Sequence, residues 1–162
     1  MILAILSDTH DHVDTLVEAL RVLAPHNPGF YVHCGDLGGQ RMLDRLAGLP
    51  AGFVFGNTDF DHAGLARYAV QVGVRCFGAH GTFEFDGKRL AVLHGDDERL
   101  LRRLLDSQEY DYLLQGHTHQ RTDQRHGKTR LINPGALHRA RPRTVATLDL
   151  QSDVLEFLTV GA

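Results

Sequence analysis

A chain of 162 residues fits one domain and is long enough to bury a hydrophobic core without disulfides. Hydrophobic residues make up 43% and charged residues 23% of the sequence, which is ordinary for a globular protein, and no apolar stretch approaches membrane-spanning length. The net charge of -3, with histidine neutral, disfavours a long nucleic acid as a partner. We expect a single domain over residues 1–162.

The first third of the chain alternates apolar runs with helical spacing. The run at residues 1–6 stops abruptly at polar residues, which indicates a strand buried on both faces. Apolar residues recur at helical spacing from Val13 to Ala24, and Pro25 ends that helix. The next elements are expected to be a strand at Phe30–Cys34, a short helix at Gln40–Ala47 and a strand at Phe53–Phe55. This alternation predicts a parallel sheet covered by helices.

The second half of the chain is predicted to be mainly β with one helix. A turn at Asp86-Gly87 separates two strands of a hairpin, and the second strand runs into His94. Leucines from Leu100 to Leu105 mark the helix. Further strands are expected at Tyr110–Leu114, Arg121–Arg125, Thr129–Ile132, Val145–Leu150 and Val154–Val160.

The N-terminal run and the two cysteines bear on location. The run is too short for the apolar region of a secretory signal, and it lacks preceding basic residues. Cys34 and Cys76 stand in unrelated contexts, so reduced thiols are the simplest interpretation. We therefore expect a cytoplasmic protein without a membrane partner.

Five short polar motifs follow predicted strands, where open α/β sheets bind ligands. They are Asp8-Thr9-His10, Gly35-Asp36, Gly56-Asn57, His94-Gly95 and Gly116-His117-Thr118-His119. Their carboxylates, imidazoles and amide, without a thiolate, suit manganese, iron, nickel or zinc. Two carboxylates beside two divalent cations would leave about two positive charges, which would attract a phosphate and hold a hydroxide at neutral pH.

Each motif taken alone has an ordinary explanation. A Gly-Asp pair is often a simple turn, and two histidines in a His-x-His pair share one face of a strand by periodicity alone. Five motifs of matching chemistry at consecutive strand ends are hard to assign to chance, which favours a metal site.

The order D-x-H, G-D, G-N-x-D, H-G and G-H-x-H resembles that of the calcineurin-like metallophosphoesterases. The short length and the later Asn133-Pro134-Gly135 resemble the small single-domain bacterial and archaeal phosphodiesterase branch. The resemblance covers nearly the whole chain. It implies an α/β fold, a four-layer α/β/β/α sandwich of two mixed sheets with the site at strand ends.

The resemblance also implies a ligand set for two divalent cations. Asp8, His10 and His119 would bind one cation. The second cation would be bound by Asn57, His94 and His117, and Asp36 would bridge the two because its oxygens can serve both. Manganese is the favoured metal, with nickel, iron, zinc and magnesium left open.

The implied reaction is phosphodiester hydrolysis by a hydroxide shared between the metals, without a protein nucleophile. Asp36, Asn57 and His94 would then take part in catalysis as well as in metal binding. Many relatives have a histidine, a proton donor to the leaving group, where this chain has Thr58. Threonine is no general acid near neutral pH, so we expect either a bias toward substrates with good leaving groups or a proton donor from elsewhere in the site.

Two further features have alternative interpretations. Asp59 is either a catalytic-site carboxylate that orients a ligand histidine or the N-cap of a following helix. Arg139, Arg141 and Arg143 form either a solvated basic loop or a clamp for a substrate phosphate.

Alternative functions stay open at this point. The expected substrate is a small or nucleotide-like phosphodiester, with a phosphomonoesterase as an alternative and a homo-oligomer left open. A subunit of the retromer coat is similar in fold but serves as a scaffold with an altered metal site. A nuclease is disfavoured by the net charge. The complete set of seven ligand side chains favours hydrolysis.

Overall fold

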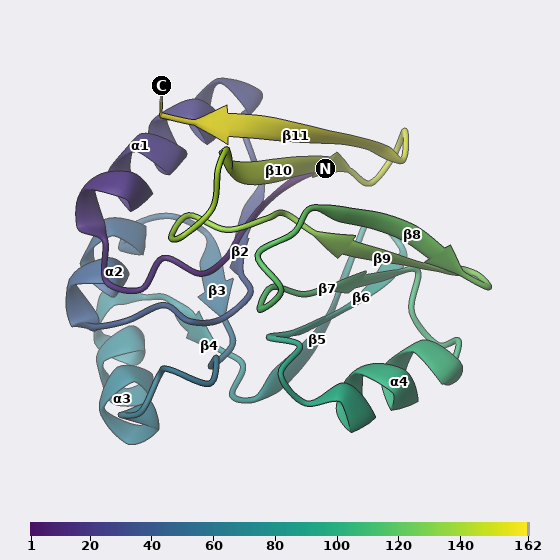
Figure 1. The fold of residues 1–162 in the computed structure, drawn as a ribbon, viewed down its shortest axis with the longest axis horizontal. Helices are drawn as coiled ribbons and strands as arrows, with labels where there is room; N and C mark the ends of the chain where they lie inside the picture. Colours follow the sequence, from purple (N-terminus) through teal and green to yellow (C-terminus); the bar gives the residue numbers. More distant parts are fainter. Residues whose placement is uncertain (162) are drawn as a thin grey trace.

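The computed structural model describes residues 1–161, in which the strands form two mixed sheets (Figure 1). The first sheet contains, in spatial order, β11 (Val154–Val160), β10 (Arg143–Asp149), β1 (Ile2–Leu6), β2 (Phe30–His33), β3 (Ala51–Phe53) and β4 (Arg75–Cys76). The second contains β5 (His80–Phe85), β6 (Lys88–Leu93), β7 (Tyr112–Leu114), β9 (Thr129–Asn133) and β8 (Thr122–His126). The helices are α1 (Val13–Leu23), α2 (Gln40–Leu46), α3 (His62–Val72) and α4 (Glu98–Asp106), and a 3-10 turn, η1 (Ala24–His26), follows α1.

Strand β1 shows why the first sheet needs cover on both faces. All side chains from Leu3 to Leu6 are fully buried. Leu3 and Ile5 pack into the core between the two sheets, whereas Ala4 and Leu6 pack against the helices. This alternation follows from the two-residue period of a strand. The prediction of a doubly buried strand is confirmed.

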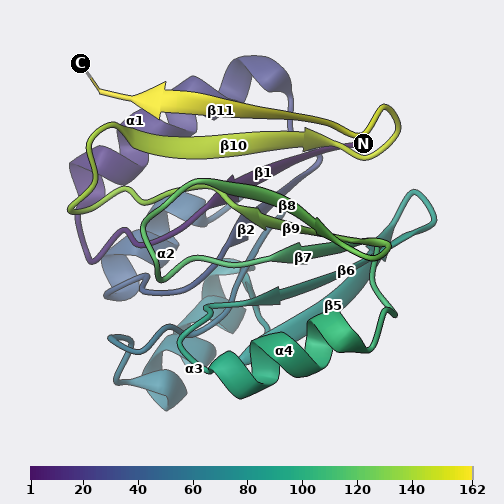
Figure 2. The ribbon, with the colours of Figure 1, turned by 45° about the vertical axis from the view of Figure 1, so that its right-hand side comes forward.

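Three separate apolar cores define four layers (Figure 2). Helices α1, α2 and α3 cover the outer face of the first sheet, and α4 covers the outer face of the second sheet through Leu104 and Leu105. Between the sheets, Val32 of β2 belongs to the same core as Val92 of β6 and Leu114 of β7. The predicted α/β/β/α sandwich of two mixed sheets is therefore confirmed.

Parallel pairing brings the ends of several strands to common edges. Strands β1 to β4 pair in parallel, as do β6, β7 and β9, while β10, β11, β5 and β8 pair antiparallel to their neighbours. The carboxyl ends of β1, β2 and β3 therefore lie at one edge of the first sheet. Those of β6 and β7 lie together at an edge of the second.

Most predicted elements lie within a few residues of their observed positions. The Asp86-Gly87 hairpin turn is confirmed, with φ of 51° and 72° at its two central residues. Strand β3 is displaced by two residues, because it begins at Ala51 rather than at Phe53. Helix α3 and strand β4 were not predicted. Within residues 1–161, no helix combines the length and the apolar character needed to cross a membrane.

Candidate metal centre

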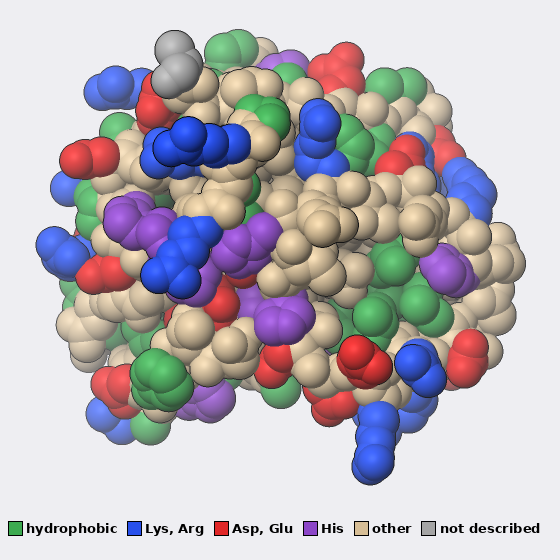
Figure 3. All heavy atoms as spheres, in the orientation of Figure 1, with side chains coloured by type: hydrophobic (Ala, Val, Ile, Leu, Met, Phe, Trp, Pro, Cys, Tyr) green, Lys and Arg blue, Asp and Glu red, His purple; other side chains and the backbone are tan. Residues whose placement is uncertain are grey.

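The loops that follow β1, β2, β3, β6 and β7 meet at one place. Backbone hydrogen bonds tie neighbouring loops together: Asp8 N to Gly35 O at 3.1 Å, and Gly116 N to His94 O at 2.9 Å. The backbone N–H of His117 also donates to Asp8 Oδ2 at 3.3 Å, which joins a loop of the second sheet to a loop of the first. Histidine side chains gather on this face of the molecule, with acidic groups between them (Figure 3).

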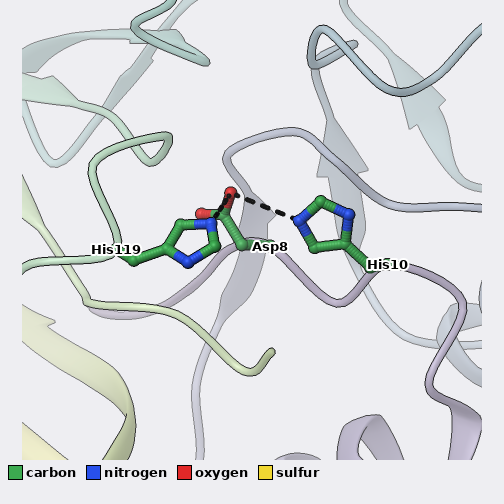
Figure 4. Close-up of side chains that lie close together, drawn as sticks. All are labelled: Asp8, His10 and His119. Atoms are coloured by element: carbon green, nitrogen blue, oxygen red, sulfur yellow. Dashed lines mark ion pairs between the residues drawn. The ribbon is translucent and has the colours of Figure 1, made fainter. Parts of the chain in front are cut away.

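Asp8, His10 and His119 form the first group of candidate ligands. His119 Nε2 lies 3.1 Å and His10 Nε2 lies 3.9 Å from the same oxygen, Asp8 Oδ1. Figure 4 shows the two rings approaching that oxygen from opposite sides. Asp8 is fully buried, and among the described residues neither Asp8 Oδ1 nor His10 Nε2 makes a hydrogen bond. Buried polar atoms without partners are rare, and a cation would satisfy both.

Asp36 connects the first group to the second. Its Oδ2 atom lies 3.4 Å from His10 Nε2 and 3.4 Å from His94 Nε2. Asn57 Oδ1 lies 3.0 Å from His94 Nε2 and 3.1 Å from His117 Nδ1. The structure therefore places all seven predicted ligands in one cluster, with Asp36 between its two halves.

Hydrogen bonds govern the charge and orientation of Asp36 and His94. Burial alone would raise the pKa of the Asp36 carboxyl, but hydrogen bonds from His94 and from the Thr58 backbone N–H outweigh burial and lower this pKa. Burial opposes protonation of His94, but its bonds to Asp36 and to the Cys34 carbonyl outweigh burial and raise the His94 pKa. His94 Nδ1 lies 2.8 Å from Cys34 O, so we assign Nδ1 as the donor, and Nε2 faces the cluster.

Left-handed backbone conformations direct many of the candidate ligands inward. Asp8, His10, Asp36, His117 and His119 have φ between 45° and 66°. Such conformations cost non-glycine residues about 1–2 kcal/mol each. Strain of this kind persists where the surroundings determine the backbone, and it concentrates at functional sites.

A buried histidine supports the loop between Asp8 and His10. His33 Nε2 lies 2.9 Å from the hydroxyl of Thr9, which donates to Leu37 O at 2.9 Å. Burial, followed by the nearby charge of His94, lowers the pKa of His33 to about 3. A neutral His33 therefore joins the ends of β1 and β2.

Two glycines allow the loops to approach each other. A Cβ atom on Gly56 would lie 2.2 Å from Asp36 Oδ1, and one on Gly116 would lie 1.9 Å from Ser7 Oγ. Both distances are far below contact distance. Glycine is therefore required at both positions by close packing rather than by a positive φ.

Asp59 makes neither of the contacts predicted for it. Its carboxylate accepts backbone hydrogen bonds from Leu37 N at 3.1 Å, Gly38 N at 2.8 Å and Gly56 N at 2.8 Å. No histidine contacts it among these bonds, and Asp61 is the N-cap of α3. Asp59, only 2% exposed, instead ties the loop carrying Asp36 to the loop carrying Asn57.

Sequence reasoning missed two features beside the cluster. The His138 ring lies 5.1 Å from the His10 ring and stacks on the His12 ring at 4.2 Å. At the part of the cluster that contains Asn57, a hollow of about 400 Å³ is lined by Asn57, His94 and Phe60. Proximity across loops, rather than any local signal, produces both features.

The donor chemistry fits divalent cations. Imidazole nitrogens and carboxylate oxygens converge, and two of these atoms are buried without partners. Two overlapping sets of side chains lie close enough together to hold an ion: Asp8 with His10 and His119, and Asp8 with Asp36 and His94. A histidine and carboxylate cluster of this kind, at strand ends between two packed sheets, fits the class of metal-dependent phosphoesterases, whose metals activate water for attack on a phosphate.

The chain belongs to the calcineurin-like phosphoesterase superfamily, because the model of this domain family matches residues 1–153. It is 27% identical over 138 residues to phosphodiesterase MJ0936 of Methanocaldococcus jannaschii, covering 83% of each chain. Two solved structures share the fold. One is an archaeal phosphodiesterase, with a TM-score of 0.91, 23% identity and coverage of 99% of this chain and 100% of the other. The other is Vps29 of Chaetomium thermophilum, with a TM-score of 0.73, 13% identity and the same coverage.

Proposed function

We propose that this chain hydrolyses phosphodiesters with the aid of two divalent cations. The buried and unpartnered Asp8 Oδ1 and His10 Nε2 are the observation that carries the proposal. Asp8, His10 and His119 would hold one cation. The other would be held by Asn57, His94 and His117, with Asp36 shared between them. When bound, such cations make water a stronger nucleophile at neutral pH and offset the charge of the phosphate.

The residues of the chain supply positioning. Asp36 is held by the Thr58 backbone N–H at 2.9 Å, so that its other oxygen faces both His10 and His94. The hydrogen bond of His94 to the Cys34 carbonyl fixes its ring, as is common for ligand histidines. Manganese is our proposed metal, because the donors are hard or intermediate and include no thiolate.

Thr58 shapes the substrate preference. Its hydroxyl lies 3.4 Å from His10 Nδ1, where it can orient that ring but cannot donate a proton to a leaving group near neutral pH. We therefore propose esters with acidic leaving groups, such as aryl diesters, as the better substrates. The name of the M. jannaschii relative supports a diester rather than a monoester.

The likeness to Vps29 does not favour a scaffold function for this chain. At 13% identity it concerns the fold alone. All seven candidate ligands are present here and converge, which supports hydrolysis. We further propose one domain over residues 1–162 in a cytoplasmic setting, which is supported by the two free cysteines, Cys34 and Cys76.

The test uses protein stripped of metal. It is assayed on an aryl phosphodiester and the matching aryl phosphomonoester, with manganese, nickel, magnesium and zinc added back separately, and bound metal is measured by elemental analysis. His119→Ala should lower both bound metal and turnover, whereas His126→Ala, at the exposed end of β8, should change neither. Failure of every metal to restore diester hydrolysis would refute the proposal.

A further inference from the structure

A basic hollow lies beside the histidines of the metal centre. Its walls include Arg139, Arg141 and Arg143 together with His12 and His138, and its volume is about 490 Å³. No Asp or Glu lines it, and among residues 1–161 none of the three arginines forms an ion pair with a carboxylate. In Figure 3, Lys and Arg side chains lie next to the histidines on this face. A chain with a net charge of -3 thus has a local positive site there.

The hollow is adjacent to the proposed site of reaction. His138 is a wall of the hollow, and its ring lies 5.1 Å from the ring of His10. His12, also in the wall, stacks on His138 at 4.2 Å. A molecule with its reacting phosphate at the centre could therefore extend a second group over these rings toward the arginines.

The loop that carries the arginines is anchored to the metal loops. Leu137 N donates to Ser7 O at 3.2 Å, next to Asp8, and the Asn133 side chain donates to Gly116 O at 2.7 Å, next to His117. At the far end, the Thr144 hydroxyl donates to Pro134 O at 2.8 Å. These bonds hold the base of the loop at a set position relative to the centre, so it can act as a fixed platform for binding.

The hollow on the opposite side has a different character. Its walls include Phe55, Phe60 and Leu100, but also Asp96 and Asp97. Phe60 is 88% exposed. The carboxylates of Asp96 and Asp97 in the wall disfavour an anion in this hollow. The two flanks of the centre therefore differ in charge, and only the arginine flank suits a negatively charged group.

We infer that the arginine hollow binds a second anionic group of the substrate, so that preferred substrates are phosphodiesters that carry an additional phosphate on one arm. Guanidinium groups match phosphate oxygens in charge and in hydrogen-bond geometry. The inference rests on the proposed phosphodiesterase function and adds the class of substrate.

The test compares two substrates that differ only in the distant group. These are the 4-nitrophenyl ester of thymidine 5′-phosphate and the same ester with a 3′-phosphate, both of which release 4-nitrophenolate. With the metal-loaded full chain we expect kcat/KM to be about tenfold higher for the 3′-phosphorylated ester, which equals about 1.4 kcal/mol of binding. The difference should appear mainly in KM.

Variants then assign the preference to the arginines. Arg139→Ala, Arg141→Ala and Arg143→Ala, singly and together, should reduce the ratio of the two kcat/KM values toward one, mainly by raising KM for the 3′-phosphorylated ester. The corresponding lysine variants should keep part of the preference, because the charge remains. Arg103→Ala, an exposed arginine on α4, is the control and should leave the ratio unchanged.

The outcomes separate the two proposals. An unchanged ratio in the triple alanine variant, or equal use of both esters by the original chain, would overturn the inference while leaving the phosphodiesterase function intact. Inorganic phosphate could also change the rates on both esters equally, and do so only while the arginines are present. That result would mean that the hollow binds a free anion rather than a group of the substrate, and it would also contradict the inference. Binding of thymidine 3′,5′-bisphosphate against thymidine 5′-phosphate, measured by calorimetry, tests the hollow without turnover.

Discussion

Replacement of Asp59 by Asn tests whether this residue supports the metal loops through the backbone alone. Asp59 Oδ2 accepts from Leu37 N and Gly56 N, and Oδ1 accepts from Gly38 N. An asparagine can place its single carboxamide oxygen where Asp59 Oδ2 accepts the two bonds from Leu37 N and Gly56 N. Its NH₂ group then faces the N–H of Gly38, so that two donors oppose each other at a partly buried position.

The cost can be worked from these contacts. Losing one charge-assisted bond costs about 1.5–3 kcal/mol, and leaving a donor without a partner adds at most about 1–3 kcal/mol, less where the donor is only partly buried, as here. We take about 3 kcal/mol as the net loss in the free energy of unfolding, since the loop can relax in part. For a chain of this size, that corresponds to a fall in Tm of about 6–12 °C.

Asp61→Asn is the matched control, two residues along the same loop. Asp61 is exposed and accepts from Gly64 N at 2.9 Å as the N-cap of α3, where Asn is nearly as favourable as Asp. Thermal unfolding of the metal-free proteins should separate the two variants, and manganese titration should show weaker binding in Asp59→Asn alone. Equal Tm values for the two variants would refute the reasoning.

Other predictions concern the metal, the packing, the pH response and the leaving group. Manganese at 100 times its Kd should stabilise the chain by about 2.7 kcal/mol in thermal unfolding, and His119→Ala should abolish most of that gain. Gly116→Ala should cost about 1–3 kcal/mol in urea unfolding, because the added methyl overlaps Ser7 Oγ, and should weaken metal binding. The pKa of His33 falls from 6.5 to about 3 on folding, so neutral His33 stabilises the folded chain fully above pH 6.5, and this stabilisation is lost as the pH falls toward 3. A His33→Gln variant should therefore lose less free energy of unfolding than the original chain over that pH range, as measured by urea unfolding. Aryl diesters should react much faster than alkyl diesters, and Thr58→His should narrow the gap in kcat/KM; equal rates on both in the original chain would contradict the argument on Thr58.

The sequence predicts the layers well because the apolar patterns of its long elements are strong. Residues 1–6 and the hairpin at Asp86-Gly87 carry their signals locally. Strand β3 was placed two residues late because Ala51 and Gly52 are weak strand formers, and their pairing with Tyr31 and Val32 of β2 decides the boundary. Helix α3 buries only Gly64, Leu65 and Ala69, so its apolar periodicity is faint.

The candidate site could likewise be predicted only in part. The seven ligand positions were found because each follows a strand, and the order of motifs matched a known family. Their metal roles stay predictions. The function of Asp59 was not predictable, since it depends on three backbone N–H groups from two loops. The stacking of His138 on His12 likewise arises only when the loop after β9 folds over the start of α1.

The arrangement separates support, metal binding and substrate choice among different residues. The left-handed turns at Asp8 and Asp36 are unfavourable by themselves, so something else must hold them in place. Asp59 does so by accepting hydrogen bonds from backbone N–H groups, and His33 by its contact with the Thr9 hydroxyl. Neither side chain faces the ligand atoms that lack partners. Damage to this support should therefore weaken metal binding from a distance. A change in the loop of Arg141 should instead alter which diester is preferred, and leave the affinity for metal unchanged.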